Sequence, residues 1–583
     1  MGYRTLRHCI DALRRIGRLV DVDEPVDPRL EMAAVQRRVF ERGGPALYFS
    51  NPVGCSFPMV SNLFGTEERL EFIFRDGIEA LRQAIQWGAD PLQSRLELSP
   101  TLGMSGWFSR PKFGRRAPVL DCRTTLDALP KLVSWPMDGG PYITLPQVYT
   151  EDPDHPGVSR SNLGMYRVQI SGNDYLPNQE AGLHYQIQRG IAAHHAVAIR
   201  RGESLPVNVF IGGAPAMTLA AVMPLPEGFS ELRFAGILGR HRIPLFAQKN
   251  TLPVYAEADF CLTGFLDGCN VKSEGPFGDH LGYYSLRHDF PVFRVDNVFH
   301  RKDAVWPFTV VGRPPQEDSM FGRFIHRLVG SVVTKKLPGV RAVHAVDEAG
   351  VHPLLLAVGS ERYSPFDPNR RTAELHTLAH AILGFGQLSL AKYLFIVAQE
   401  DDPALDIYDT EKFLKHVLSR ADWRRDVHFV TKTTADTLDY CDGELNRGSK
   451  MFVAASGPPI RELPTQFDGD VKSKNPRIAF PGVVCIEGNI VTNDTALEKF
   501  PLIVLVDDSK FASSNLRNFL WTTFTKSDPA TDVHGVDEFT KHKHWGCTGP
   551  LVIDARRKPH HAPELEEPPE VAKLADAIVE RLL

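Results

Sequence analysis

The chain has 583 residues, of which 43% are hydrophobic and 23% charged, and its formal net charge is −5. These proportions are ordinary for a globular protein of two to four domains and exclude a mostly disordered chain. The slight acidic excess argues against a general nucleic-acid-binding protein, which needs an excess of Lys and Arg. No run approaches the 18 apolar residues of a transmembrane helix, so none is expected.

Other global features favour a cytoplasmic protein with reduced thiols. The N-terminus lacks the apolar stretch of a signal peptide, and the eight cysteines contain no Cys-x-x-Cys pair. A disulfide scaffold and a zinc ribbon are therefore not expected. No internal repeat is apparent in the sequence.

Apolar spacing predicts helices in the N-terminal region. It indicates one helix within the first 20 residues, followed by a short strand, and further helix over 66–90. Residues 91–118 are rich in Pro, Gly, Ser and Arg, which predicts a connector. From about 120 to 330 the pattern becomes β-rich, with one interrupting helix expected over 179–202. The expected strands, typical of a barrel or sandwich, are 207–213, 254–266, 290–301 and 304–315.

From about residue 338, strands and helices alternate, which predicts an α/β layer domain. We expect helices over 371–385 and 410–421, with a buried strand at 392–402 between them. The last 15 residues predict an amphipathic helix. The apolar stripe of this helix can pack either on its own domain or on a partner molecule. The stripe comprises Val571, Leu574, Ala575, Ile578 and Leu582.

The loop SEGPFGDHLGYY at 273–284 carries two acids, Glu274 and Asp279, around Gly and Pro residues. Two carboxylates on one stiff loop suit an acid/base pair, because close carboxylates disfavour double ionisation. A solvated acidic turn is the alternative. An Arg such as Arg167 beside them would hold one acid ionised and could grip a substrate carboxylate.

Candidate metal ligands lie in two further segments. Asn162 and His184 offer an oxygen and a nitrogen, and the segment YAEADF adds Glu257 and Asp259. Together they suit Mn²⁺ or Mg²⁺, although His184 could equally be a satisfied core histidine. Lys392 opens a buried strand and could contact a phosphate or simply lie at the surface. The sequence contains no serine-hydrolase elbow, P-loop, HExxH or dinucleotide-binding GxGxxG motif.

Taken together and in order, these segments resemble the UbiD family of prenylated-FMN-dependent decarboxylases. The resemblance spans roughly residues 5 to 405. It rests on SNLGMYRVQI, GLHYQIQRG, VNVFIGGAPAMTLAAVMPLP, EGPFGDHLGYY, DNVFHRKDAVWPFTVVGRPPQED and AKYLFIVAQEDD.

The resemblance implies roles for individual residues. The catalytic positions match Arg167, Glu274 and Asp279. A Mn²⁺ ion would be bound by Asn162, His184 and Asp259, where Asp259 departs from the family's usual Glu and Glu257 is the alternative. A K⁺ ion is expected beside backbone oxygens near Ala221 to Met223. The expected flavin-binding residues are Met165, Tyr166, Arg167, His184, Tyr185, Gln186, Arg189, Gly190 and Lys392.

The implied fold is a multidomain α/β protein. It comprises an N-terminal α/β domain (1–120), a split β-barrel that binds the flavin (121–335), and a C-terminal α/β domain with the terminal helix and an oligomerisation extension (336–583). A homodimer or homohexamer is expected, with a flavin prenyltransferase supplying the cofactor.

The implied reaction is reversible, non-oxidative decarboxylation of an aromatic or heteroaromatic acid, in which the flavin serves as the electron sink. A polycyclic acid is one substrate class, because His280, Phe321, Phe324 and Phe385 could shape a broad apolar pocket. A 4-hydroxy-3-polyprenylbenzoate and a simple hydroxybenzoate are others. A plain FMN oxidoreductase and a non-catalytic binding homologue are the alternatives from different classes.

Overall fold

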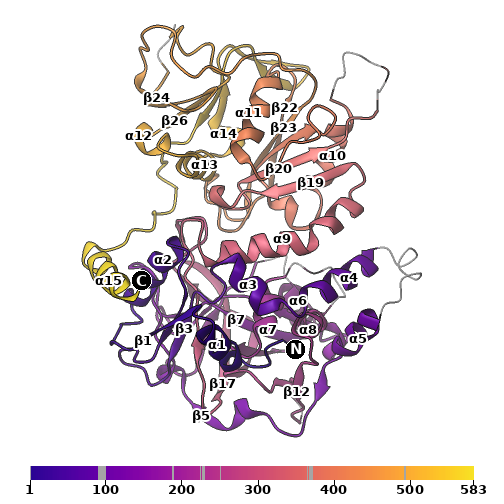
Figure 1. The fold of residues 1–583 in the computed structure, drawn as a ribbon, viewed down its shortest axis with the longest axis vertical. Helices are drawn as coiled ribbons and strands as arrows, with labels where there is room; N and C mark the ends of the chain where they lie inside the picture. Colours follow the sequence, from indigo (N-terminus) through magenta and orange to yellow (C-terminus); the bar gives the residue numbers. More distant parts are fainter. Residues whose placement is uncertain are drawn as a thin grey trace. The chain divides into compact units, whose positions relative to one another are not determined.

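The computed structural model describes residues 2–89, 100–186, 190–223, 225, 230–249, 251–363, 366, 372–490 and 494–583. Contacts divide the chain into two compact units (Figure 1). Unit 1 comprises Met1–Val329 and Glu564–Leu583, and unit 2 comprises Gly330–Pro563. No helix in the described part of the chain is both long enough and apolar enough to cross a membrane.

Unit 1 begins with the predicted helix and strand, α1 (Leu6–Arg15) and β1 (Leu19–Val22). Thr5 caps α1, because its hydroxyl accepts the backbone N–H of His8 at 3.3 Å. A second helix, α2 (Glu31–Glu41), leads into a small four-stranded sheet. Its strands run in the order β1, β2 (Ala46–Phe49), β3 (Met59–Ser61) and β18 (Trp306–Pro307).

The region after this sheet contains more helix than predicted. The expected helix over 66–90 is two helices, α3 (Glu67–Phe74) and α4 (Ile78–Ala89). The predicted connector at 91–118 was partly wrong, because it contains α5 (Pro100–Phe108). Proline suits the first position of a helix, where no N–H partner is needed, so Pro100 marked a helix start and not a loop.

A nine-stranded antiparallel sheet forms the centre of unit 1. Its strands follow the order β6-β9-β10-β17-β14-β11-β7-β8, and β5 pairs with β17. A long hairpin of β14 (Phe260–Glu274) and β17 (His288–His300) confirms two predicted strands, and β11 (Leu205–Ile211) confirms a third. The other strands are β5 (Cys122–Thr124), β6 (Tyr142–Ile143), β7 (Pro146–Glu151), β8 (Ser161–Gly164), β9 (Val168–Gln169) and β10 (Glu180–Leu183).

The helix predicted over 179–202 was wrong in its first half. Residues 180–183 form β10 between β9 and β17, and the helix α6 begins only at Gly190 and ends at Arg201. Gly182 explains the strand, since a Cβ there would lie 2.3 Å from the hydroxyl of Tyr175. Two further helices, α7 (Pro215–Val222) and α8 (Glu231–Gly239), contact β8.

Unit 2 contains two five-stranded sheets. The first has the order β19-β20-β21-β23-β22, and the second β24-β25-β26-β30-β27. The first sheet comprises β19 (Val340–Ala345), β20 (Leu354–Gly359), β21 (Tyr393–Ala398), β22 (Val427–Thr434) and β23 (Arg447–Ala455). The second comprises β24 (Lys474–Phe480), β25 (Val483–Glu487), β26 (Leu502–Val506), β27 (Val533–Gly535) and β30 (Leu551–Asp554). The predicted helices appear as α10 (Glu374–Leu383) and α11 (Thr410–Arg420).

The two sheets of unit 2 share one topology, although no internal repeat is apparent in the sequence. In each sheet the first pair of strands is antiparallel, the next two pairs are parallel, and the last pair is antiparallel. A helix follows the third strand in both halves, α11 in the first and α13 (Leu516–Thr525) in the second. The hydrophobic core between them draws residues from both sheets.

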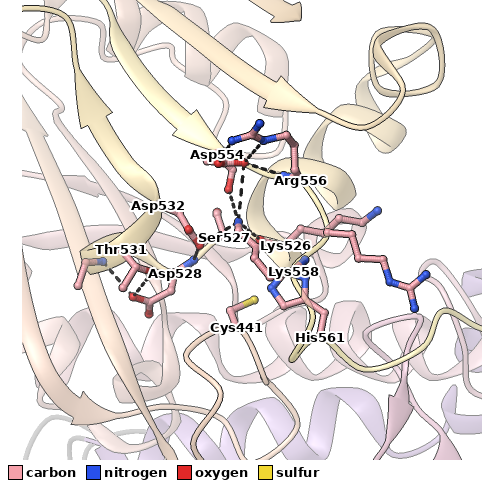
Figure 2. Close-up of polar contacts among 12 residues, drawn as sticks. Cys441, Lys526, Ser527, Asp528, Thr531, Asp532, Asp554, Arg556, Lys558 and His561 are labelled. Carbon is pink, nitrogen blue, oxygen red and sulfur yellow. Dashed lines mark hydrogen bonds and ion pairs between the residues drawn. The ribbon is translucent and has the colours of Figure 1, made fainter. Parts of the chain in front are cut away.

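A polar cluster lies in the second half of unit 2 near Cys441 of the first half (Figure 2). The thiol of Cys441, in the loop between β22 and β23, donates to the carbonyl oxygen of Thr525 at the end of α13 (2.8 Å). After β30, Lys558 Nζ lies 3.1 Å from Asp532 Oδ2 and 2.6 Å from the carbonyl oxygen of Asp554. Each charge in this cluster has a protein partner, so the cluster is structural.

The terminal helix α15 (Pro569–Leu582) belongs to unit 1 and packs on α2, not on the C-terminal domain in which the prediction placed it. Ala575, Ile578 and Val579 are buried, whereas Leu574 of the predicted stripe is 42% exposed. Arg38 of α2 fastens the helix, donating to Glu567 Oε2 at 2.7 Å.

Candidate active site

The three predicted catalytic residues meet in unit 1. Arg167 directly precedes β9, Glu274 ends β14, and Asp279 follows the short strand β15 (Phe277–Gly278). Arg167 holds Glu274 in a bidentate pair, with Nε–Oε1 at 2.9 Å and Nη2–Oε2 at 2.8 Å. Its Nη1 donates to Asp279 Oδ2 at 2.5 Å. One guanidinium therefore bridges two carboxylates.

Burial and charge set the ionisation of this cluster. Glu274 is 0% exposed, and its burial alone would raise its pKa, but the adjacent Arg167 charge and the His184 hydrogen bond bring that pKa well below its usual value. Burial also opposes ionisation of Asp279, yet bonding to His280 and the Arg167 charge lower its pKa. The two acids in turn raise the pKa of Arg167 despite burial. All three groups are therefore charged at neutral pH.

Two residues that the sequence analysis missed hold the acidic loop in place. Asp138 Oδ1 accepts the backbone N–H of Gly278 at 2.8 Å, and Gln169 Oε1 accepts that of Gly275 at 3.0 Å. Burial raises the pKa of Asp138 to about 6. Asp138 stands in an ordinary Asp-Gly-Gly turn, so no motif marked it.

His184 is joined to the acid pair. Its Nδ1 donates to Glu274 Oε2 at 3.1 Å, and its ring centroid lies 4.0 Å from that of Phe290. Burial, followed by the Arg167 charge, lowers the pKa of His184, so the ring is neutral. With Nδ1–H engaged, the lone pair of Nε2 is available to a metal ion.

Asn162 lies on β8 and packs closely against the start of α6. Tyr166 donates its hydroxyl to Asn162 Oδ1 at 3.3 Å, while the buried Nδ2 has no partner among the described residues. A Cβ on Gly190 would lie only 2.3 Å from Asn162 Oδ1. The first residue of α6 therefore approaches Asn162 as closely as glycine allows.

The acid beside Asn162 is Glu231, which the sequence analysis missed. Glu231 opens α8, and its Oε2 accepts the backbone N–H of Leu163 at 3.1 Å. Burial raises its pKa to about 7, although the backbone N–H groups of Glu231 and Leu163 oppose that shift. The sequence signal that could have identified Glu231 was its position in the first turn of a helix, just after the segment at 214–225.

The structure uses the predicted metal acid Asp259 differently. Its two oxygens accept the backbone N–H groups of Gly213 (2.8 Å) and Val305 (3.1 Å). The alternative, Glu257, lies 3.5 Å from Arg301. Neither acid contacts Asn162 or His184 within the described part of the chain, whereas Glu231 bonds to the backbone of Leu163, the residue after Asn162.

The other predicted flavin-binding residues lie as follows. Tyr185 shares a 2.6 Å hydrogen bond with His195, and its ring lies edge-on to Tyr166 at 6.4 Å. Gln186 follows Tyr185. The backbone N–H of Met165 donates to the carbonyl oxygen of Ala221 (2.8 Å), where the K⁺ ion is expected.

The remaining predicted flavin-binding residues are Arg189 and Lys392. Arg189 falls outside the described residues. Lys392 belongs to unit 2, where its Nζ pairs with Asp439 Oδ2 at 2.7 Å. Burial opposes the charge of Lys392, but Asp439 raises its pKa.

The predicted aromatic pocket was partly wrong. Phe321 and Phe324 are buried in the core of unit 1, with ring centroids 5.0 Å from Phe64 and 5.5 Å from Phe74, respectively. They follow the N-terminus of α9 (Glu317–Lys336) on its apolar face. They pack against other side chains of the protein and are not available to shape a substrate pocket.

Comparison with known proteins decides the family. Three consecutive domains of 3-octaprenyl-4-hydroxybenzoate carboxy-lyase match this chain: the N-terminal domain at residues 10–87, the Rift-related domain at 112–314 and the C-terminal domain at 319–455. The chain belongs to the UbiD family. Several proteins of Chlamydia match this chain almost end to end. One, from Chlamydia pneumoniae, is named as a subunit of 4-hydroxybenzoate decarboxylase and is 38% identical over 97% of this chain and 96% of its own. An uncharacterized protein of Chlamydia trachomatis is 39% identical over 96% of each chain.

Solved structures share the UbiD fold. The closed form of vanillic acid decarboxylase from Sedimentibacter hydroxybenzoicus superposes with a TM-score of 0.66 at 21% identity, covering 82% of this chain and 97% of that one. The UbiD-class enzyme HmfF from Pelotomaculum thermopropionicum, solved in complex with FMN, gives a TM-score of 0.60 at 24% identity, covering 82% and 98%. The predicted mixed α/β multidomain fold is thus confirmed, and the family is one of carboxy-lyases.

Proposed function

We propose that the protein is a prenylated-FMN-dependent carboxy-lyase that reversibly decarboxylates an aromatic or heteroaromatic acid. The observation that carries the proposal is the buried Arg167 guanidinium bridging Glu274 and Asp279 in a UbiD-family chain. A plain FMN oxidoreductase has no need for this charged cluster. A non-catalytic homologue would have no reason to keep three competent side chains together.

The residues around Asn162 fit a flavin with its phosphate and a divalent ion. The unpartnered Asn162 Nδ2 and the close approach of Gly190 leave a polar cradle at the N-terminus of α6, where backbone N–H groups favour an anion. Asn162, His184 and Glu231 would bind Mn²⁺ as an oxygen, nitrogen and carboxylate set, and we assign the acid position to Glu231 in place of Asp259. Backbone oxygens near Ala221 would bind K⁺. Prenylated FMN, when bound, supplies the electron sink for the bond to CO₂.

The protein side chains divide the remaining work. Arg167 donates one N–H from Nε, one from Nη1 and two from Nη2, so one Nη1 hydrogen is left to orient the substrate carboxylate. Glu274, held ionised, fixes Arg167 and His184. Asp279 lies beside His280 and is the acid that delivers the proton replacing CO₂.

The substrate class is set by analogy within the family. The Chlamydia pneumoniae relative is named for 4-hydroxybenzoate, so 4-hydroxybenzoate is the first acid to test. A 4-hydroxy-3-polyprenylbenzoate, after which the family is named, is the second. We expect the protein to be a homodimer or homohexamer in the cytoplasm. A flavin prenyltransferase would supply its cofactor.

The test begins with protein co-expressed with a flavin prenyltransferase. We expect the released cofactor to have the mass of prenylated FMN and the holoenzyme to release CO₂ from an aromatic acid. Glu274→Gln should keep the flavin and lose CO₂ release. Plain FMN with unaffected redox activity would favour the oxidoreductase, and absence of any flavin would favour the binding homologue.

A further inference from the structure

An exposed apolar patch lies at α5 and the strand that follows it in unit 1. Met104, Trp107 and Phe113 are 48%, 58% and 59% exposed, although large apolar side chains are usually buried. Trp107 lies near the end of α5, and Phe113 ends the short strand β4 (Lys112–Phe113). The decarboxylase site does not use any of these three residues.

The patch is surrounded by positive charge. Strand β4 pairs with β12 (Pro244–Phe246), which brings residues 104–116 beside residues 240–249, and neither segment contains Asp or Glu. Among the ion pairs of the described residues, only Arg116 pairs with an acid, Asp121 at 3.2 Å. The cationic residues are Arg110, Lys112, Arg115, Arg116, Arg240, Arg242 and Lys249. A chain with a net charge of −5 thus places five exposed cations in these two paired segments, whereas Arg240 and Arg242 are partly buried; the exposed ones are Arg110, Lys112, Arg115, Arg116 and Lys249.

Arg242 holds the exposed tryptophan in place. Its Nε and Nη2 donate to the carbonyl oxygens of Arg110 (2.8 Å) and Pro111 (2.9 Å), and its guanidinium carbon lies 4.7 Å from the centre of the Trp107 ring. The indole is therefore fixed at the surface by a cation–π contact. The patch is built on ordered backbone.

We propose that this surface, which we call the α5 patch, docks onto an anionic phospholipid membrane. Trp and Phe prefer the membrane interface, and Lys and Arg around them are attracted to anionic headgroups. Each such cation strengthens binding about fivefold near an anionic bilayer. A symmetric contact between two copies would face the patch with itself and oppose its exposed cations to the same cations, which disfavours a second copy as the occupant. The inference is independent of the proposed decarboxylase activity.

The experiment is flotation of the full-length holoprotein with vesicles of phosphatidylcholine alone or mixed with phosphatidylglycerol, at low and high salt. We expect binding only to the mixed vesicles, weakened by salt. The triple variant Arg110→Gln, Lys112→Gln, Arg115→Gln should lose about a hundredfold in partitioning, at about fivefold per charge. The matched control neutralises three exposed lysines of unit 2 and should bind as the wild type does. Those lysines are Lys510, Lys541 and Lys543.

A second measurement does not depend on the charge variants folding. Brominated lipids should quench the tryptophan fluorescence of the wild type, and Trp107→Phe should remove most of that quenching. Failure of the wild type to bind mixed vesicles would overturn the proposal. So would equal loss in the control variant, a change of oligomer mass in the patch variants without vesicle binding, or salt-sensitive binding to RNA alone.

Discussion

Replacing Arg167 with lysine tests the central cluster most directly. Lysine keeps one positive charge but has a single ammonium group, so it cannot bridge Glu274 and Asp279 with the bidentate geometry of a guanidinium. The substitution removes the donors that face Glu274 at 2.8 and 2.9 Å or the donor that faces Asp279 at 2.5 Å. One acid is then left buried with a weaker partner, and its pKa rises.

The size of the effect follows from the hydrogen bonds. Of the four that Arg167 makes, at least two are lost, and bonds of this charged type contribute about 1.5–3 kcal/mol each. The loss is therefore about 3–6 kcal/mol. At about 1.4 kcal/mol per tenfold change in rate, kcat/KM should fall by roughly two to four orders of magnitude.

The assay is CO₂ release from the acid that the wild-type holoenzyme turns over, measured together with flavin content and melting temperature. Arg294→Lys is the matched control, because Arg294 pairs only loosely with Glu180 (3.7 Å) and is partly exposed. It should change kcat/KM less than twofold. An Arg167→Lys enzyme with normal flavin content and turnover within tenfold of the wild type would refute the reasoning.

Three further substitutions test other parts of the structure. Asp279→Asn should stop product formation while flavin absorbance is retained, and turnover near the wild-type value would contradict its role as proton donor. Gly190→Ala should lower flavin occupancy at least tenfold, because its Cβ would lie 2.3 Å from Asn162 Oδ1. Unchanged occupancy, measured by absorbance, would refute the proposal that the flavin phosphate binds at the N-terminus of α6. Glu567→Gln should cost about 1–2 kcal/mol of unfolding free energy, discounted for partial exposure. Burial opposes the ionisation of Glu567, but Arg38 and Arg37 lower its pKa. The stability that Glu567 contributes is therefore present above its unfolded pKa of about 4.3 and is lost as the pH falls through the folded pKa. Equal acid sensitivity of the melting temperature in the wild type and in the variant would contradict this.

The catalytic acids could be predicted because they are close in sequence. Glu274 and Asp279 share one loop whose glycines and proline indicate a fixed turn, so their proximity follows from local geometry. Arg167 lies 107 residues before Glu274, and only the ordered set of family motifs associated it with them. Strand periodicity then explains why the β-rich centre was predicted well, since alternation is a strong signal in antiparallel sheets.

The missed features depend on tertiary contacts. Glu231 bonds to the backbone of Leu163, next to Asn162, only because α8 packs on β8, and a lone Glu at a helix start is common for dipole reasons alone. The family resemblance selected Asp259, and the sequence alone does not distinguish a metal ligand from a buried acid that accepts two backbone N–H groups. The repeat in unit 2 was invisible because β21 and β26 are both uniformly apolar, as is any buried parallel strand.

The net charge of the site determines which acid holds the proton that replaces CO₂. Arg167 contributes one positive charge and Glu274 and Asp279 one negative charge each, so with His184 neutral the cluster has a net charge of −1. A substrate carboxylate brought to the remaining Nη1 hydrogen adds a second net negative charge and raises the pKa of a neighbouring acid. Glu274 is fully buried and accepts two hydrogen bonds from Arg167, whereas Asp279 is 8% exposed and lies beside His280. We therefore expect Asp279 to take up the proton.

Substrate binding should therefore be linked to uptake of about one proton, which is then the proton delivered to the ring carbon. Calorimetric titration with an unreactive aromatic carboxylate, in two buffers of different ionisation enthalpy at neutral pH, measures that uptake. The corresponding amide should bind without it, and Asp279→Asn should abolish it for the acid. Binding of the acid to the wild-type holoenzyme with no buffer dependence would mean that the proton comes from elsewhere, and Asp279 would then only position Arg167.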